Sequence, residues 1–128
     1  MAKEKNLYKK LKSQMKRSKI IRVETWINLG VPDCLVGIKG RWVLVELKVA
    51  TKTGKIKFSP HQISFHKKHE DLACFIFVSS FDLKSMNVYE SKRILELKDH
   101  GLNSIPELKG VLNGSSFEDY LIRVTDSF

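Results

Sequence analysis

The tripeptide Glu-Leu-Lys occurs three times in this 128-residue chain, at Glu46–Lys48, Glu96–Lys98 and Glu107–Lys109. An acid and an amine can act on one ligand only where the backbone turns both side chains toward it. Glu96–Lys98 lies on a predicted helix, where residues two apart point about 200° away from each other. Glu107–Lys109 follows Pro106 in a segment without a clear pattern, whereas Glu46–Lys48 lies in an apolar run typical of a strand, where residues two apart share one face. We therefore expect chemistry only at the first copy.

A predicted β-hairpin adds a second carboxylate to this strand. If Lys39 and Gly40 are the two turn residues, antiparallel pairing places Asp33 directly across from Glu46, with Cβ atoms about 5 Å apart. Lys48 then lies one step along the same face. The alternation of the hairpin supports this register, because only Arg41 interrupts an apolar opposite face made of Cys34, Val36, Ile38, Val43, Val45, Leu47 and Val49.

Two carboxylates directly opposed in a sheet repel each other, so a bound divalent cation is the simplest reason for the pairing of Asp33 with Glu46. Mg²⁺ takes carboxylate oxygens and keeps several waters, and it can lower the pKa of a water and neutralise charge on a phosphoryl group. Lys48 could orient that water or stabilise the oxyanion. A structural reading stays open, in which Asp33 starts a strand after Pro32 and Glu46 with Lys48 is an ordinary edge pair.

Charge is distributed unevenly along the chain. Residues 1–69 contain 17 Lys or Arg against four acids, a net charge of +13, and residues 70–128 contain six against ten, a net charge of −4. A basic front half favours a polyanionic partner, most economically nucleic acid. The alternative is a basic, solvated face that only keeps the protein soluble.

The elements that must position these residues follow from periodicity and from capping residues. Ser59, Pro60 and Gln62 have the spacing of a capping box with proline at the first helical position, so a helix is expected to begin at Pro60. Hydrophobic spacing and β-branched runs predict the remaining elements. We expect helices at 3–17, 89–100 (closed by Gly101) and 116–124, and strands at 20–26, 33–38, 41–49 and 73–80.

Length and composition indicate one domain over residues 1–128. No apolar run is long enough for a membrane span and no secretory signal is visible, so a cytoplasmic protein without membrane contact is expected. Cys34 and Cys74 lie in apolar runs and are expected to be buried free thiols. His66 and His69 lack the further ligands of a zinc site and are expected at the surface.

The segments GVPDCLVGIKGRWVLVELKV and KFSPHQISFHKKH, residues 30–49 and 57–69, resemble the PD-(D/E)XK nuclease superfamily and specifically its VRR-NUC branch. Members of that branch carry a GvPD step, an E-x-K strand and a helix that opens with S-P-x-Q. The resemblance covers about residues 20–78. It implies an α/β (α+β) fold, a restriction-endonuclease-like αβββαβ core with a mixed central sheet flanked by helices.

The resemblance also implies roles for individual residues. Asp33 and Glu46 look like the metal-binding carboxylates for Mg²⁺, with Mn²⁺ as a substitute, and Lys48 looks like the catalytic lysine. Gln62 matches a family glutamine that would touch the site or the substrate, although capping alone would explain it. Many members, including archaeal Holliday-junction resolvases, add a glutamate from the first helix. Glu4 matches that position, and Glu24 on a neighbouring strand competes with it.

The activity implied is metal-dependent hydrolysis of DNA phosphodiester bonds. We expect Arg22, Lys52, Lys55 and Lys57 to contact the DNA backbone, and Gly54 to make the basic loop mobile. The leading hypothesis is a homodimeric endonuclease specific for branched DNA, similar to Holliday-junction resolvases. The alternatives are a nicking or restriction-like endonuclease without junction preference and a catalytically silent DNA-binding module.

Overall fold

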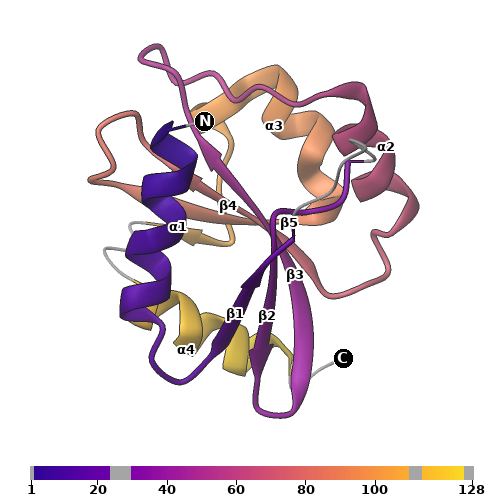
Figure 1. Ribbon diagram of the computed structural model, residues 1–128. Coiled ribbons are helices and arrows are strands. Elements are labelled where there is room, and N and C mark those ends of the chain that lie inside the picture. The colour runs from indigo at the N-terminus through magenta and orange to yellow at the C-terminus, as the bar shows by residue number, and fades with distance from the viewer. Residues whose placement is uncertain (1, 24–29, 110–113, 126–128) are drawn as a thin grey trace.

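The structure, a computed structural model, describes residues 2–23, 30–109 and 114–125. Its elements follow one another along the chain around a single six-stranded sheet of order β1-β2-β3-β4-β5-β6 (Figure 1). They are α1 (Ala2–Gln14), β1 (Lys19–Arg22), β2 (Cys34–Ile38), β3 (Arg41–Val49), α2 (Pro60–Lys68), β4 (Cys74–Ser79), β5 (Met86–Glu90), the 3₁₀ turn η1 (Ser91–Arg93), α3 (Ile94–His100), the 3₁₀ turn η2 (Gly101–Asn103), β6 (Leu108–Lys109) and α4 (Gly114–Thr125).

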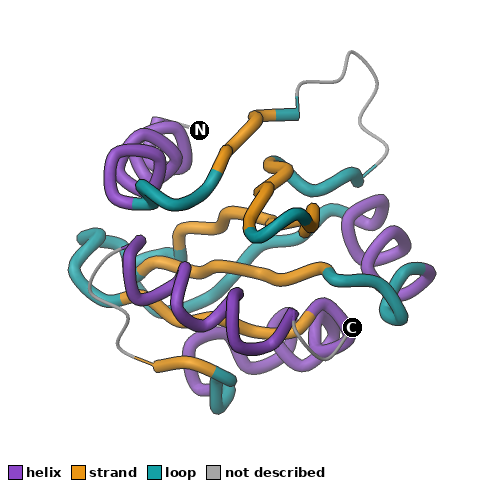
Figure 2. Tube along the Cα trace, turned by 90° about the horizontal axis from the view of Figure 1, so that it is seen from below, coloured by secondary structure: helices purple, strands orange, loops and turns teal. Residues whose placement is uncertain are grey.

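The sheet is mixed, as the sequence predicts. Strands β3 and β4 pair in parallel, because the chain crosses over through α2, and the other neighbouring strands pair antiparallel. Seen from below, the strands occupy the centre and helices lie outside them (Figure 2). The fold is therefore α+β, with a mixed sheet flanked by helices.

The β2–β3 hairpin has the predicted turn and register. Lys39 and Gly40 both have positive φ, at 50° and 74°, which is the backbone that a two-residue hairpin turn needs to match the twist of its strands. Ile38 pairs with Arg41 and Cys34 pairs with Val45. Because the register is as predicted, every side chain of β3 lies on its expected face.

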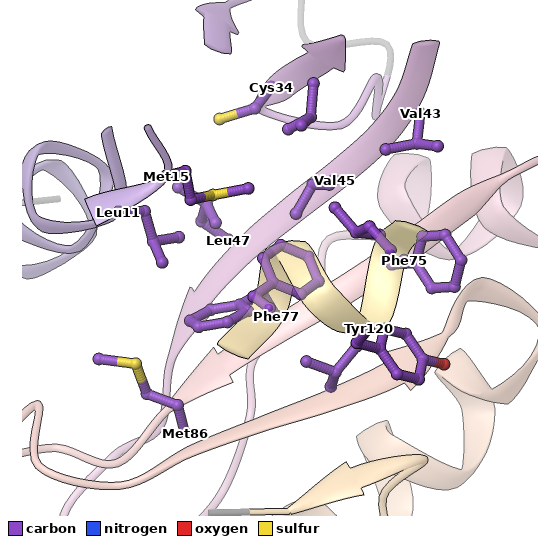
Figure 3. Packing of buried hydrophobic residues seen from close by; sticks show 14 of the residues in the cluster. Leu11, Met15, Cys34, Val43, Val45, Leu47, Phe75, Phe77, Met86 and Tyr120 are labelled. Atoms are coloured by element: carbon purple, nitrogen blue, oxygen red, sulfur yellow. The ribbon is translucent and has the colours of Figure 1, made fainter. Parts of the chain in front are cut away.

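The larger apolar core lies between one face of the sheet and helices α1 and α4. Leu7 and Leu11 of α1 and Met15, directly after it, are buried there, as their helical spacing predicts, and Tyr8 is partly buried. Figure 3 shows Leu11 and Met15 beside Leu47 of β3. The smaller core, on the opposite face, contains Ala50, Ile56, Ile76, Val78, Tyr89, Ile94 and Leu97.

The structure differs from the prediction over residues 86–93. Tyr89 and Glu90 end strand β5 instead of beginning a helix, and α3 starts only at Ile94. Val88 packs in the larger core and the next residue, Tyr89, packs in the smaller core on the opposite face of the sheet. Consecutive side chains point to opposite faces in a strand but not in a helix, so this segment forms a strand.

Other boundaries differ less. The first helix ends at Gln14 rather than at residue 17, and β1 ends at Arg22. Gly101 follows α3, where its closing glycine is expected.

No described helix is long and apolar enough to cross a membrane.

Candidate functional site

Glu46 and Lys48 share the face of β3 that lies opposite α1. Val45 and Leu47, which alternate with them, pack into the larger core, so the period of the strand turns Glu46 and Lys48 toward the α2 side. The side chain of Glu46 is only 1% exposed, whereas Lys48 is half-buried. This is a buried carboxyl with an amine at its outer edge.

Asp33 lies immediately before β2 and is held against β3. Its Oδ2 atom accepts a hydrogen bond from the backbone N–H of Leu47 at 2.9 Å, and its carboxyl group lies near enough to that of Glu46 to raise the pKa of Glu46. The two carboxyl groups therefore converge, as the hairpin register predicts.

Gly30 explains how the chain reaches Asp33. Its φ is +77°, and a Cβ placed there would lie 2.1 Å from the carbonyl oxygen of His61. Any larger residue would push residues 30–33 away from the first turn of α2. The glycine thus permits the close approach that brings the aspartate and α2 to one place.

The buried carboxyl of Glu46 has a strongly perturbed pKa. Burial, and after it hydrogen bonding to Asp33 and the charge of Asp33, raise that pKa from 4.5 to about 10, although the charge of Lys48 acts in the opposite direction. The Oε1 atom of Glu46 is buried without a hydrogen-bond partner. A carboxyl in this state requires either a proton or a cation, so the donor set fits a divalent cation held between Asp33 and Glu46.

Gln62 links α2 to Lys48. Its Oε1 accepts a hydrogen bond from Lys48 Nζ at 3.1 Å and another from the backbone N–H of Ser59 at 2.9 Å. The backbone N–H of Gln62 donates to Ser59 Oγ at 3.1 Å, which completes the predicted capping box. The capping role of Gln62 is confirmed, and the same amide oxygen also contacts the Lys48 amine; a role of Gln62 toward a substrate stays a prediction. Lys48 Nζ also lies 5.1 Å from the centre of the Phe58 ring.

His66 is buried, and the prediction that it lies at the surface is wrong. Its ring is fully inaccessible, with Nδ1 2.5 Å from Ser91 Oγ and Nε2 3.6 Å from Glu46 Oε1. Burial lowers its pKa to about 4, so the ring is neutral near pH 7. The prediction failed because the lack of further zinc ligands argues against a metal site but says nothing about burial. The spacing of four between Gln62 and His66 was the available signal, since residues i and i+4 share a helix face.

Both cysteines are buried free thiols, as predicted. Burial raises the pKa of Cys34 to about 12 and that of Cys74 to about 11, so neither is a ready nucleophile. Cys74 Sγ lies 3.5 Å from His66 Nδ1.

His69, also predicted at the surface, is half-buried, and its ring stacks on that of Phe65 with ring centres 4.2 Å apart.

Glu4 is not brought into contact with Asp33 or Glu46 by any interaction among the described residues. It lies in the first turn of α1, beside a cleft of about 480 Å³ that is also lined by Lys52 and Phe81. The buried side of α1, with Leu7 and Leu11, packs on the other face of the sheet. The charge of Glu4 still contributes, as a minor cause, to the raised pKa of Glu46. The assignment of Glu4 stays a prediction, and the competing Glu24 lies outside the described residues.

The predicted DNA-binding cations are all exposed. Arg22 is on edge strand β1, 5.4 Å from the Tyr8 ring, and Lys52, Lys55 and Lys57 lie on the loop that follows β3. Gly54 is held by hydrogen bonds, whereas we expected it to make the loop mobile. Its N–H donates to the carbonyl of Thr51 and its carbonyl accepts from the N–H of Leu102, each at 2.9 Å. Its φ of +86° serves a hydrogen-bonded turn that fixes the basic loop against η2, rather than giving it mobility.

The other two Glu-Leu-Lys copies do not form such a site. Glu96 and Glu107 both pair with Arg93, and Lys98 is exposed on α3. Within residues 2–23, 30–109 and 114–125, no three His, Cys, Asp or Glu side chains gather as a ready-made metal cage. Asp33 and Glu46 thus supply a pair of ligands, and Mg²⁺ is often held in proteins by one or two carboxylates plus water.

No protein-family model matches this chain, and no curated protein matches it.

Proposed function

We propose that this chain is a Mg²⁺-dependent endodeoxyribonuclease of the PD-(D/E)XK type, which hydrolyses phosphodiester bonds of branched DNA as a homodimer. The order α1-β1-β2-β3-α2-β4 is compatible with the αβββαβ core of those nucleases. The observation that carries the proposal is the buried, unpartnered Oε1 of Glu46 beside a second carboxylate. Two converging acids in a protein interior are costly unless a cation compensates them.

Each residue of the site has a definite task in this proposal. Asp33 and Glu46 would hold Mg²⁺, which supplies a water of lowered pKa and neutralises charge on the phosphoryl group. Lys48 would donate hydrogen bonds to the attacking water or to the developing oxyanion. Gln62 restrains the Lys48 amine at 3.1 Å and so reduces the entropy that the lysine would lose in the transition state.

The substrate class follows from the distribution of charge. The exposed lysines at positions 52, 55 and 57 follow the catalytic strand directly, where they can contact phosphates that flank the cut. Such contacts read the backbone rather than the base sequence, so selectivity would come from the shape of the DNA. A homodimer would present two sites to two strands of a junction.

The test is cleavage of labelled four-way junction, flap, duplex and single strand with Mg²⁺, Mn²⁺ or EDTA. Glu46→Gln and Lys48→Ala should each reduce the rate at least about 100-fold, while DNA binding measured in EDTA is retained. Glu96→Gln and Lys98→Ala, which alter another copy of the same tripeptide, are the matched controls and should cut normally. Equal cutting of all four DNAs would remove the preference for branches.

A catalytically silent DNA-binding module is the second candidate. It is favoured by the absence of a third gathered ligand in the described part of the chain and by a Glu46 pKa high enough for a neutral, purely structural carboxyl. In that case Glu46→Gln and Lys48→Ala would leave every measured activity unchanged.

A nicking or restriction-like endonuclease differs from a junction resolvase in the symmetry of its products. Paired symmetric cuts in cruciform plasmid support resolution, and single nicks in ordinary duplex oppose it. The molecular mass in solution, measured by light scattering, tests the homodimer separately.

A further inference from the structure

The face of the sheet that carries Glu46 continues beyond the candidate site toward the β2–β3 turn. Residues paired directly across strands project on one face, and the register places Lys19, Gly37 and Trp42 in one such row. The next row contains Ile21, Leu35 and Leu44, and Glu46 lies two residues beyond Leu44 on the same face of β3. Figure 1 shows the β2–β3 turn at the end of the hairpin away from α2.

Trp42 is an exposed aromatic platform in the first of these rows. Its side chain is 54% exposed although it is the largest apolar residue of the hairpin. A Cβ at position 37 would lie 2.9 Å from the Trp42 ring, so the indole packs directly over the glycine. One side of the ring is therefore supported by the sheet, and much of its surface remains open to a ligand.

Cations surround this platform. A hollow of about 320 Å³ at the hairpin end is lined by Trp42 and by Arg17, Lys19, Lys39 and Arg41. Arg17 is engaged by Asp119 and Glu118, and Arg41 donates to the carbonyl of Thr125. The exposed lysines at positions 19 and 39 are thus the cations best placed to meet an anion.

Apolar side chains lie between Trp42 and the candidate site. Ile21 is 50% exposed, and Leu35 and Leu44 are half-buried between the two rows of polar residues. Trp42 and Glu46 are four residues apart on one strand, which corresponds to about 13 Å. That length matches about four stacked nucleotides at 3.4 Å each.

We propose that Trp42, with Lys19 and Lys39, forms a second contact site for a single DNA strand, in which an unpaired base stacks on the indole and neighbouring phosphates meet the two lysines. This inference rests on the proposed function only for the direction of the strand, which would run along the face from Trp42 to Glu46. A stacking ring beside cations is what sequence-tolerant binding of single strands requires. Flaps and single-stranded ends of branched DNA carry the unpaired bases that such a site can accept.

A second copy of this chain is the competing occupant of the same face. The positive lining favours DNA, because two copies would bring the same lysines together around the symmetry axis. The experiment nevertheless has to distinguish the two occupants, because an exposed tryptophan suits either.

Binding of an unlabelled oligothymidylate is measured in EDTA by fluorescence of Trp42, in a Trp26→Phe background that leaves one tryptophan. Stacking should quench that fluorescence, and Trp42→Ala, followed with a labelled strand, should raise Kd about 10-fold or more. Trp42→Phe should recover most of the affinity. Ile105→Ala removes an apolar side chain that is 80% exposed before β6 and should change nothing.

Salt dependence tests the lysines. Lys19→Ala and Lys39→Ala should each lower the slope of log Kd against log salt concentration by about one. Lys84→Ala, at an exposed lysine between β4 and β5, is the matched control and should leave the slope unchanged.

The outcomes separate this site from the proposed nuclease. Quenching by the oligonucleotide without any cleavage would support the stacking site and overturn the nuclease. If the protein cleaves DNA and Trp42→Ala binds the oligonucleotide with an unchanged Kd, the nuclease is supported and the stacking site is wrong. If Trp42→Ala instead halves the molecular mass in solution and leaves DNA binding intact, the face is a dimer contact and the stacking site is wrong. A melting temperature for each variant excludes loss of folding as the cause.

Discussion

The two ends of β3 present the same face of one strand in opposite environments. At the α2 end, Glu46 is 1% exposed and its carboxyl lies against Asp33 and His66. At the turn end, Trp42 is 54% exposed among cations. Strand periodicity is common to both, so the helix that covers one end and leaves the other open creates the difference. Burial at the covered end shifts the pKa values of Glu46 and His66, as catalytic sites often require. The open end offers an exposed ring and cations, which suit binding of a ligand.

Glu46→Gln should have the largest effect on stability, because it removes an ionisable group from the covered end. The folded pKa of about 10 lies above the ordinary 4.5, so the folded protein keeps a proton that the unfolded chain releases. That contribution is complete below about pH 4.5 and is lost as the pH rises toward 10. Chemical denaturation in EDTA should show the variant more stable at pH 8, by on the order of a few kcal/mol.

The same comparison reveals whether a cation binds at the covered end. Mn²⁺ should raise the melting temperature of the unmodified protein at pH 8 and leave that of Glu46→Gln nearly unchanged. Asp33→Asn should behave like Glu46→Gln, whereas Glu96→Gln should respond to Mn²⁺ normally. An equal response of all four proteins would mean that the ion binds elsewhere.

His66→Ala should cost about 2–3 kcal/mol of unfolding free energy, because it leaves a cavity and removes the partner of Ser91. His69→Ala, at the half-buried histidine of the same helix, should cost less than about 1 kcal/mol. Urea denaturation measures both. Equal losses would mean that the buried contact with Ser91 and Glu46 has no special weight.

Gln62→Ala should lower stability by about 1 kcal/mol through the lost cap and also slow cleavage, because Lys48 loses its restraint. Ser59→Ala removes the same capping box without touching Lys48 and should cost similar stability with little change in rate. Thermal melts and single-turnover cleavage compare the two variants. If both slow cleavage equally, Gln62 acts only through the helix.

Gly37→Ala should have the smallest effect on stability, less than about 1 kcal/mol, because the nearest atoms to a new Cβ all belong to the half-exposed Trp42 ring, which can move toward solvent. The new methyl would displace the Trp42 ring, so the fluorescence spectrum should shift and affinity for single-stranded DNA should fall several-fold. Gly40→Ala is not a matched control because its φ is positive. An unchanged spectrum would show that the indole does not rest on position 37.

Much of the fold was predictable because local patterns and tertiary packing agree. The Lys39–Gly40 turn sets the hairpin register, the capping box starts α2 at Pro60, and the spacing of Leu7, Leu11 and Met15 identifies the inner side of α1. Strand β5 was not predictable, because Met86–Glu90 is short and buries the adjacent Val88 and Tyr89 on both faces, so it lacks the strict alternation that identifies a strand.

For the candidate site, the sequence by itself determined that Glu46 and Lys48 share a face and that Asp33 lies near them, because the Lys39–Gly40 turn sets the hairpin register and a strand has a period of two. Only the tertiary structure decided what surrounds that face. The crossover through α2 buries Glu46 against His66 and brings Gln62 to Lys48. Such contacts join residues far apart in the chain, and no local spacing encodes them.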